Sequence, residues 1–188
     1  MVISPAEIPA SLQFNAVEWF SQFSADGKPI DSTELQPILE FTLLWSLFER
    51  ETCDRFVRLV DLRKHVDEAS AKDQLMRDAY EPYLLFFRTR YSQFGEAGYL
   101  SSSLEPAQHS QGCGDSNEIL LLQKVLEGTC KGLNDMVFAL LFIAYRIRNN
   151  LFHGEKNIYR LHTQRSLFVA VNSLLATYLG QTCRRMRN

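Results

Sequence analysis

The chain has 188 residues, of which 46% are hydrophobic and 12% aromatic, and its formal net charge at pH 7 is −2. This length predicts a single domain over residues 1–188, and the apolar content excludes disorder on the scale of a domain. The first residues lack a basic segment followed by an apolar one, so we expect no signal peptide and a cytoplasmic location. The longest apolar run is interrupted by Arg146 and Arg148, well short of the roughly 20 residues that cross a membrane, so we expect no membrane association.

Two helices are predicted in the first part of the chain. Residues 14–24 have a helical pattern that Asn15 can cap, which indicates a short helix within an N-terminal extension of residues 1–30. Asp31 is followed three residues later by an acid, as in a capping box. We therefore expect a long helix from this cap to about Thr52.

The middle of the chain predicts two further helices and a loop. Apolar residues recur with a helical period over residues 54–69 and again over 71–94. Pro82 lies inside the second pattern and predicts a kink or a restart. Residues 95–114 are rich in Gly, Ser and Pro and have no helical period, which predicts a long exposed loop.

The last part of the chain predicts three more helices, over about 115–127, 135–152 and 157–182. The central one of these three contains the longest apolar run, and Gly154 suits the turn that ends it. No segment has the alternating pattern of a strand. The sequence therefore predicts an all-α, single-domain bundle of five to seven helices.

The end of the helix over 135–152 has a polar cluster that suits a chemical site. On an ideal helical wheel, Asn149 and Arg146 lie within about 40° of His153, and the apolar residues are centred on the opposite side. Arg148 lies only about 60° from that apolar centre. An arginine at the margin of a buried face is costly unless it is paired or lies at an interface.

This cluster resembles a known family. The segment RNNLFH of residues 148–153 fits the Arg-x-x-x-x-His motif of the HEPN superfamily, with a polar residue directly after the arginine. The wider run YRIRNNLFHGEK of residues 145–156 resembles one bacterial branch of that superfamily, as do PYLLFFR of residues 82–88 and the Arg-Tyr pair of 90–91. The resemblance covers about residues 33–180.

The resemblance implies a small HEPN-like helical bundle that pairs as a two-fold homodimer. Many members of the superfamily are metal-independent ribonucleases of toxin–antitoxin and phage-defence systems, and others act only as binding or dimerisation modules. RNA and an antitoxin or other protein are therefore the implied partners, and no cofactor or metal is implied.

The resemblance and the chemistry of the side chains together assign roles to six residues. His153 would transfer protons, because an imidazole titrates near neutral pH. Arg148 would stabilise charge on a phosphorane-like transition state, and Asn149 would orient the histidine or the phosphate. The remaining candidates are predicted to bind substrate, and they are Arg146, Asn150 and Lys156.

Each role has a structural alternative. His153 can cap the helix end, and Arg148 can pair with a core-facing acid such as Glu40 or Glu49. Asn149 can be a polar residue at an interface, and Arg146 can be a solvated surface arginine. Tyr145 and Tyr159 can stack on a base, although packing in the core or at an interface is the simpler role for both.

Charge is distributed unevenly along the chain. Residues 145–188 contain eight Lys or Arg and one acid, Glu155, a net charge of +7. The other 144 residues contain the remaining 12 basic and 21 acidic residues, a net charge of −9. A basic segment around the predicted site suits a phosphate-bearing ligand, whereas the acidic remainder should repel RNA.

Other chemistry has little support in the sequence. The four cysteines are far apart, so free thiols are the better interpretation, and His109 with Cys113 gives only a weak zinc pattern. The leading hypothesis is a dimeric, metal-independent endoribonuclease that leaves 2′,3′-cyclic phosphate and 5′-hydroxyl ends. The alternatives are a catalytically silent HEPN module that dimerises or binds a protein, and a nucleotide-binding helical domain.

Overall fold

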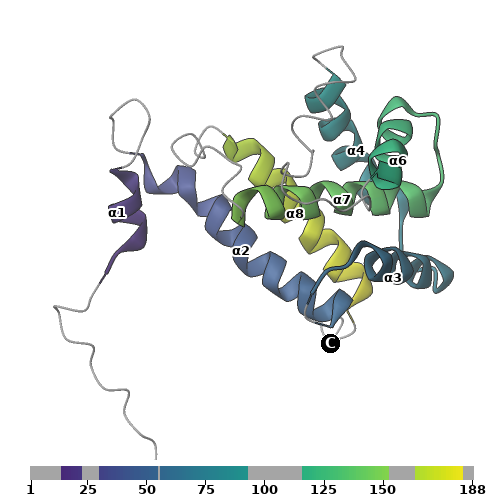
Figure 1. The fold of residues 1–188 in the computed structure, drawn as a ribbon, viewed down its shortest axis with the longest axis horizontal. Helices are drawn as coiled ribbons and strands as arrows, with labels where there is room; N and C mark the ends of the chain where they lie inside the picture. Colours follow the sequence, from purple (N-terminus) through teal and green to yellow (C-terminus); the bar gives the residue numbers. More distant parts are fainter. Residues whose placement is uncertain (1–13, 23–29, 55, 93–115, 153–163, 184–188) are drawn as a thin grey trace, which may run out of the picture.

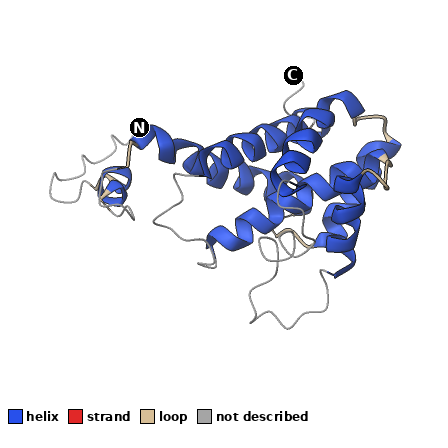
Figure 2. Cartoon of the chain, turned by 90° about the horizontal axis from the view of Figure 1, so that it is seen from above, coloured by secondary structure: helices blue, strands red, loops and turns tan. Residues whose placement is uncertain are grey.

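A computed structural model describes residues 14–22, 30–54, 56–92, 116–152 and 164–183. Over these residues the chain forms seven helices and no strand (Figure 1 and Figure 2), which confirms the all-α fold class. With the labels of Figure 1, the helices are α1 (Ala16–Ser21), α2 (Ser32–Cys53), α3 (Leu59–Ala71), α4 (Arg77–Ser92), α6 (Ser116–Glu127), α7 (Leu133–Phe152) and α8 (Arg165–Thr182).

The two predicted N-caps are confirmed. The side chain of Asn15 accepts a hydrogen bond of 3.1 Å from the backbone N–H of Glu18 at the start of α1. Asp31 accepts one of 2.8 Å from the backbone N–H of Thr33 at the start of α2. Both bonds satisfy backbone donors that the first turn of a helix leaves unpaired. Cap patterns are local, and for that reason the sequence alone predicts them well.

Several predicted boundaries were wrong. The helix predicted over 54–69 begins only at Leu59, because Asp54 ends α2 in the left-handed conformation with a φ of 48°. The helix predicted over 71–94 begins at Arg77, after a turn in which Asp73 has a φ of 52°. One continuous helix passes through Pro82, so the predicted restart is absent. Pro82 is the sixth residue of α4, so the helix continues without the bond that a nitrogen here would donate to the Asp78 carbonyl.

Some predictions fall outside the described residues. These are most of the N-terminal extension, the loop predicted over 95–114, and the first part of the helix predicted over 157–182. The described part of that last helix is α8, which begins at Arg165. No described helix has the length and apolar character needed to cross a membrane.

Helix α7 lies in the centre of the fold, with α3, α4, α6 and α8 packed against it. Every residue from 136 to 144 is buried, as expected for a helix that has neighbours on all sides. Helix α2 packs mainly on α8, and Figure 1 shows α1 beside the start of α2, far from α3, α4 and α6. The core therefore surrounds α7 and leaves the N-terminal half of α2 at the margin.

Polar contacts join helix α4 to its neighbours. The Tyr83 hydroxyl lies 2.8 Å from the hydroxyls of both Ser173 and Thr177 on α8. Arg88 donates hydrogen bonds of 2.6 and 3.1 Å to the carbonyls of Leu126 and Val125 at the end of α6. The bond to Leu126 satisfies a carbonyl of the last helical turn, and the Val125 carbonyl also accepts a bond of 3.1 Å from the N–H of Gly128. The PYLLFFR segment therefore has a clear structural role in this fold.

Candidate functional site

The last two turns of α7 carry four of the six predicted site residues. Arg146, Arg148, Asn149 and Asn150 all lie in this helix, which ends at Phe152. His153 and Lys156 lie outside the described residues, so the structure places neither of them relative to the arginines. The described part of the site is therefore the cationic and amide half of the predicted cluster.

Arg146 is buried, with only 3% of its surface exposed. This differs from the sequence analysis, which placed it on a polar face and offered a solvated arginine as its alternative role. The wheel assumed that one side of the helix is covered, whereas α7 has neighbours on several sides. A guanidinium in this position loses its hydration, which is costly unless neighbouring groups compensate for it.

Arg148 is half-buried between α7 and α2. Its Nη2 atom lies 3.8 Å from Oε1 of Glu49, and the two side chains are 29% and 17% exposed. This separation is too long for a hydrogen bond, so the attraction is mainly coulombic. Pairing with Glu49 was the structural alternative predicted for Arg148, and this ion pair is present.

Two other groups touch the guanidinium of Arg148. Its Nη1 donates a hydrogen bond of 3.2 Å to Oδ1 of Asn149. Its Cζ lies 5.4 Å from the centre of the Phe152 ring, within the range of a cation–π contact. The Nε–H is buried and has no hydrogen-bond partner among the residues that the structure describes. The guanidinium is thus held from several sides, and one of its donors is used by no described residue.

Asn149 and Tyr145 have the neighbours that packing would give them. Asn149 bonds the arginine beside it, so it helps to hold Arg148 in place. The centre of the Tyr145 ring lies 6.3 Å from the centre of the Phe142 ring at an interplanar angle of 21°. The two rings, which belong to the same helix, are therefore stacked. Packing was the simpler role predicted for this tyrosine, and it is the one observed. Tyr159 lies outside the described residues.

Metal ligands are not gathered anywhere in the described parts of the chain. No group of three or more His, Cys, Asp or Glu side chains lies close enough there to hold an ion. Cys53, Cys130 and Cys183 are free thiols. Burial raises the pKa of the Cys53 and Cys183 thiols, so neither has the low pKa of a reactive cysteine.

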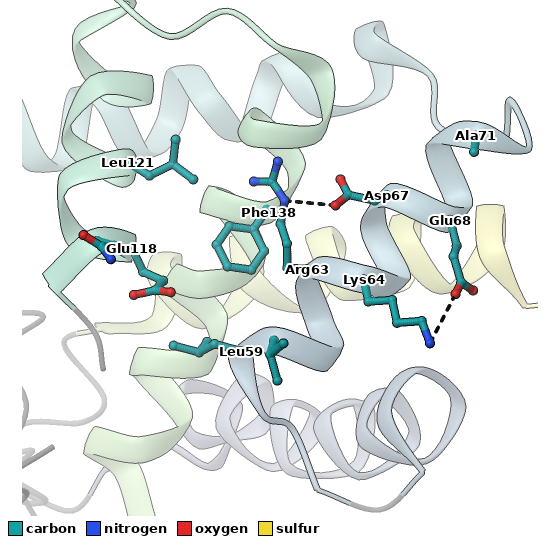
Figure 3. Close-up of a pocket in the computed structure, with 11 residues that line it drawn as sticks. Leu59, Arg63, Lys64, Asp67, Glu68, Ala71, Glu118, Leu121 and Phe138 are labelled. Atoms are coloured by element: carbon teal, nitrogen blue, oxygen red, sulfur yellow. Dashed lines mark hydrogen bonds and ion pairs between the residues drawn. The ribbon is translucent and has the colours of Figure 1, made fainter. Parts of the chain in front are cut away.

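A groove that the sequence analysis missed lies between α3 and α6, with Phe138 of α7 among its lining residues (Figure 3). Its volume is about 890 Å³. Arg63 lies 5.3 Å from the centre of the Phe138 ring and pairs with Asp67 at 3.2 Å and Asp135 at 2.8 Å. The walls come from three helices distant in sequence, so no local pattern predicts this groove.

Comparisons with known proteins assign neither a family nor a function to this chain. The chain matches no protein-family model, and neither a curated protein nor a solved structure is significantly similar to it. The function must therefore be argued from the residues and the geometry of this chain.

Proposed function

We propose that this protein is a metal-independent endoribonuclease of the HEPN type, acting as a dimer in a toxin–antitoxin or phage-defence setting. The proposed site is the end of α7 and the residues that follow it. The supporting observation is Arg148, a half-buried guanidinium whose Nε–H has no acceptor among the described residues, five residues before His153 in a segment of net positive charge.

Arg148 suits the binding of a phosphate that gains charge during reaction. Its contact with Glu49 at 3.8 Å is too long for a hydrogen bond, and its Nε–H has no acceptor in the part of the chain that the structure describes. A modest movement of the side chain would let the guanidinium donate two bonds to phosphate oxygens. Because the site is partly shielded from water, those bonds would stabilise the transition state more than in bulk solvent.

His153 is the proposed acid–base group. The 2′-hydroxyl of the RNA attacks the adjacent phosphorus and gives its proton to a base, while the bond from phosphorus to the 5′-oxygen breaks. The departing 5′-oxygen takes a proton from an acid. Two copies of His153 in a dimer would divide these tasks and leave 2′,3′-cyclic phosphate and 5′-hydroxyl ends. Asn150 and Lys156 would bind the flanking backbone.

A specific observation favours a second candidate, a catalytically silent module that binds a protein partner. Arg148 has an intramolecular partner, Glu49, and the pair links α7 to α2. Such a pair suits a residue whose task is to hold two helices together. In that case the basic segment around it would meet an acidic protein surface instead of RNA.

The proposal is tested by incubating purified protein with a mixed RNA pool in excess EDTA, and by comparing wild type with His153→Ala and Arg148→Ala. We expect wild type to cleave the pool and to leave cyclic-phosphate ends. Each substitution should lower the rate at least about 100-fold, the usual effect of losing an acid–base or charge-stabilising group. Equal cleavage by wild type and His153→Ala would refute the assigned site.

Glu49→Gln is the matched control for the two candidates. The nuclease needs Arg148 but not its ion pair, so Glu49→Gln should keep cleavage while Arg148→Ala loses it. The silent module predicts that none of the proteins cleaves RNA and that both substitutions lower the melting temperature by similar amounts. The two patterns do not overlap, because one is read from RNA ends and the other from stability.

A further inference from the structure

Helix α2 exposes a stripe of leucines on the side that faces away from the core. Leu39, Leu43 and Leu47 are 46%, 74% and 40% exposed and follow one another at intervals of four residues. The opposite side of the same helix is buried and contains Phe41, Trp45 and Phe48. Residues four apart lie on one face of a helix, so the three leucines form one continuous apolar surface. We call it the α2 stripe.

Nothing in the described chain covers the middle of the α2 stripe. Helix α1 reaches only its first turns, where Val17 and Phe20 line a small cavity together with Leu39. Single exposed leucines are ordinary, but a row of three on one helix is the pattern of a surface that meets another helix. The row therefore indicates an interface that a single copy of the chain leaves open.

Polar residues border the α2 stripe in an ordered way. Gln36 and Glu40 lie at its N-terminal end, where Nε2 of Gln36 donates a bond of 2.9 Å to the Glu40 carboxylate. Ser46 and Arg50 lie at its C-terminal end, and both are exposed. Arg50 forms no ion pair with any residue that the structure describes. An acid thus borders one end of an apolar centre and a base borders the other.

This surface is its own complement when it is turned by a two-fold axis. If two copies of α2 lie antiparallel with the axis at Leu43, each Leu39 meets Leu47 of the partner subunit. Each Arg50 then lies opposite the partner subunit's Gln36 and within reach of the partner subunit's Glu40. Apolar side chains meet in the centre and opposite charges meet at the rim, as in stable interfaces.

We propose that two copies of this chain pair through α2, antiparallel, with Leu43 on the two-fold axis. The complementarity of the stripe to itself favours a second copy over an unrelated partner, since an unrelated helix would not need the acid and the base at opposite ends. The inference rests on the dimer that is part of the proposed function, and it adds the surface through which the two copies meet. It also names the surface that would join two proposed sites, because α2 carries Glu49, the partner of Arg148.

The test is the mass of the full chain in solution, measured by sedimentation with Leu43→Glu and Leu43→Lys variants. We expect wild type to have twice the chain mass of 21.7 kDa. Each variant alone should be monomeric, because like charges would meet on the axis and raise the dissociation constant at least about 100-fold. An equimolar mixture of the two variants should form a dimer again, because opposite charges then meet.

Two controls make the outcome decisive. Leu85→Glu alters a leucine on α4 that is 64% exposed, so it should leave the dimer intact. Melting temperatures of all variants check folding, and a variant that fails to fold is replaced by Leu47→Ser on the same stripe. A monomeric wild type, a dimer that survives Leu43→Glu, or a wild type that instead binds another protein through α2 would overturn the proposal.

Cross-linking tests the direction of the two helices. In an antiparallel pair, oxidation should join Leu39→Cys to Leu47→Cys in a mixture of the two variants and should join neither introduced thiol to its own copy, with wild type as the control for the four native cysteines. A parallel pair would give the reverse result, since each position would then face its own copy. A dimer that survives Leu43→Glu refutes the α2 pairing alone, whereas a monomeric wild type also refutes the proposed two-copy nuclease site.

Discussion

Helix α7 buries every residue from 136 to 144, whereas α2 buries one side and exposes Leu39, Leu43 and Leu47 on the other. Both helices are long and both are rich in apolar side chains. The difference lies in their neighbours, because α7 is packed by α3, α4, α6 and α8, and α2 is packed mainly by α8. Apolar content alone therefore does not decide which residues form the core.

The comparison extends to the polar side chains. Arg146 on α7 is 3% exposed, although it was predicted on a polar face, while Arg50 on α2 is exposed next to leucines. A charged residue can thus lie inside the fold and apolar residues can lie outside it. The surrounding helices cover α7 on several sides. The exposed side of α2 would be covered by the second copy that we propose.

The largest expected effect comes from truncating the centre of α7. Phe142 is fully buried, so Phe142→Ala should lower the free energy of unfolding by about 3–5 kcal/mol through lost burial and a cavity. Urea denaturation at one fixed protein concentration measures this. Leu85→Ala on the exposed side of α4 is the control and should change stability by less than about 0.5 kcal/mol. Similar values for both would contradict the central position of α7.

The two arginines of α7 should differ in the same assay. Arg146→Ala removes a long buried side chain and should cost about 1–3 kcal/mol, because its packing is lost and a cavity is left. Arg148→Ala removes a partly exposed group and should cost less than about 1 kcal/mol. The reverse order would mean that Arg148, and not Arg146, is the structural arginine.

A smaller effect on stability is expected for the ion pair between Glu49 of α2 and Arg148 of α7. A double-mutant cycle of Glu49→Gln and Arg148→Ala should give a coupling free energy of about 0.2–1 kcal/mol, as for partly exposed ion pairs. Raising the salt concentration should reduce it further. A coupling well above this range would favour the silent module, in which this pair holds the two helices together.

The smallest expected effect is a pH dependence of stability that arises from His65 of α3, close to the buried side of α2. His65 lies 2.6 Å from the Tyr178 hydroxyl, and the Tyr178 ring packs against Phe48 of α2. Burial lowers the pKa of His65 below its ordinary 6.5, and the opposing effect of Glu68 is weaker. The neutral form is therefore favoured in the folded state, and its stabilising contribution is complete above pH 6.5 and is lost as the pH falls through the lowered pKa.

Thermal melting from pH 8 to pH 5 checks this dependence. The melting temperature should fall by a few degrees at most as the pH drops below 6.5, and His65→Gln should flatten that part of the curve. The mass of the dimer should not change over the same range, since the α2 stripe and its polar border contain no histidine. A loss of dimer that depends on His65 would contradict the separation of the two sides of α2.

The success of the sequence predictions depended on how local each signal was. The caps at Asn15 and Asp31 use contacts within three residues, and the structure confirms both. The start of α3 was wrong because the left-handed turn at Asp54 has no glycine to reveal it. The burial of Arg146 was missed because the helices that cover it come from distant parts of the chain.

The candidate site also combines features that local sequence patterns predict with features that only folding creates. The sequence indicated the polar end of α7 and offered Glu49 as a partner for Arg148, and the structure contains that pair. The groove between α3 and α6 had no sequence signal, since its walls meet only after folding. The nuclease and the dimer remain proposals that the experiments above test.

By itself, the sequence determined that this protein is built from helices, where most of them run, and which polar cluster ends the central helix. Helical period and caps are properties of neighbouring residues, so they can be read before any folding is known. Only the tertiary structure decided that Arg146 is buried, that Arg148 meets Glu49, and that one side of α2 stays open. These outcomes depend on which distant helices pack together, and the number of such arrangements is too large for local patterns to select one.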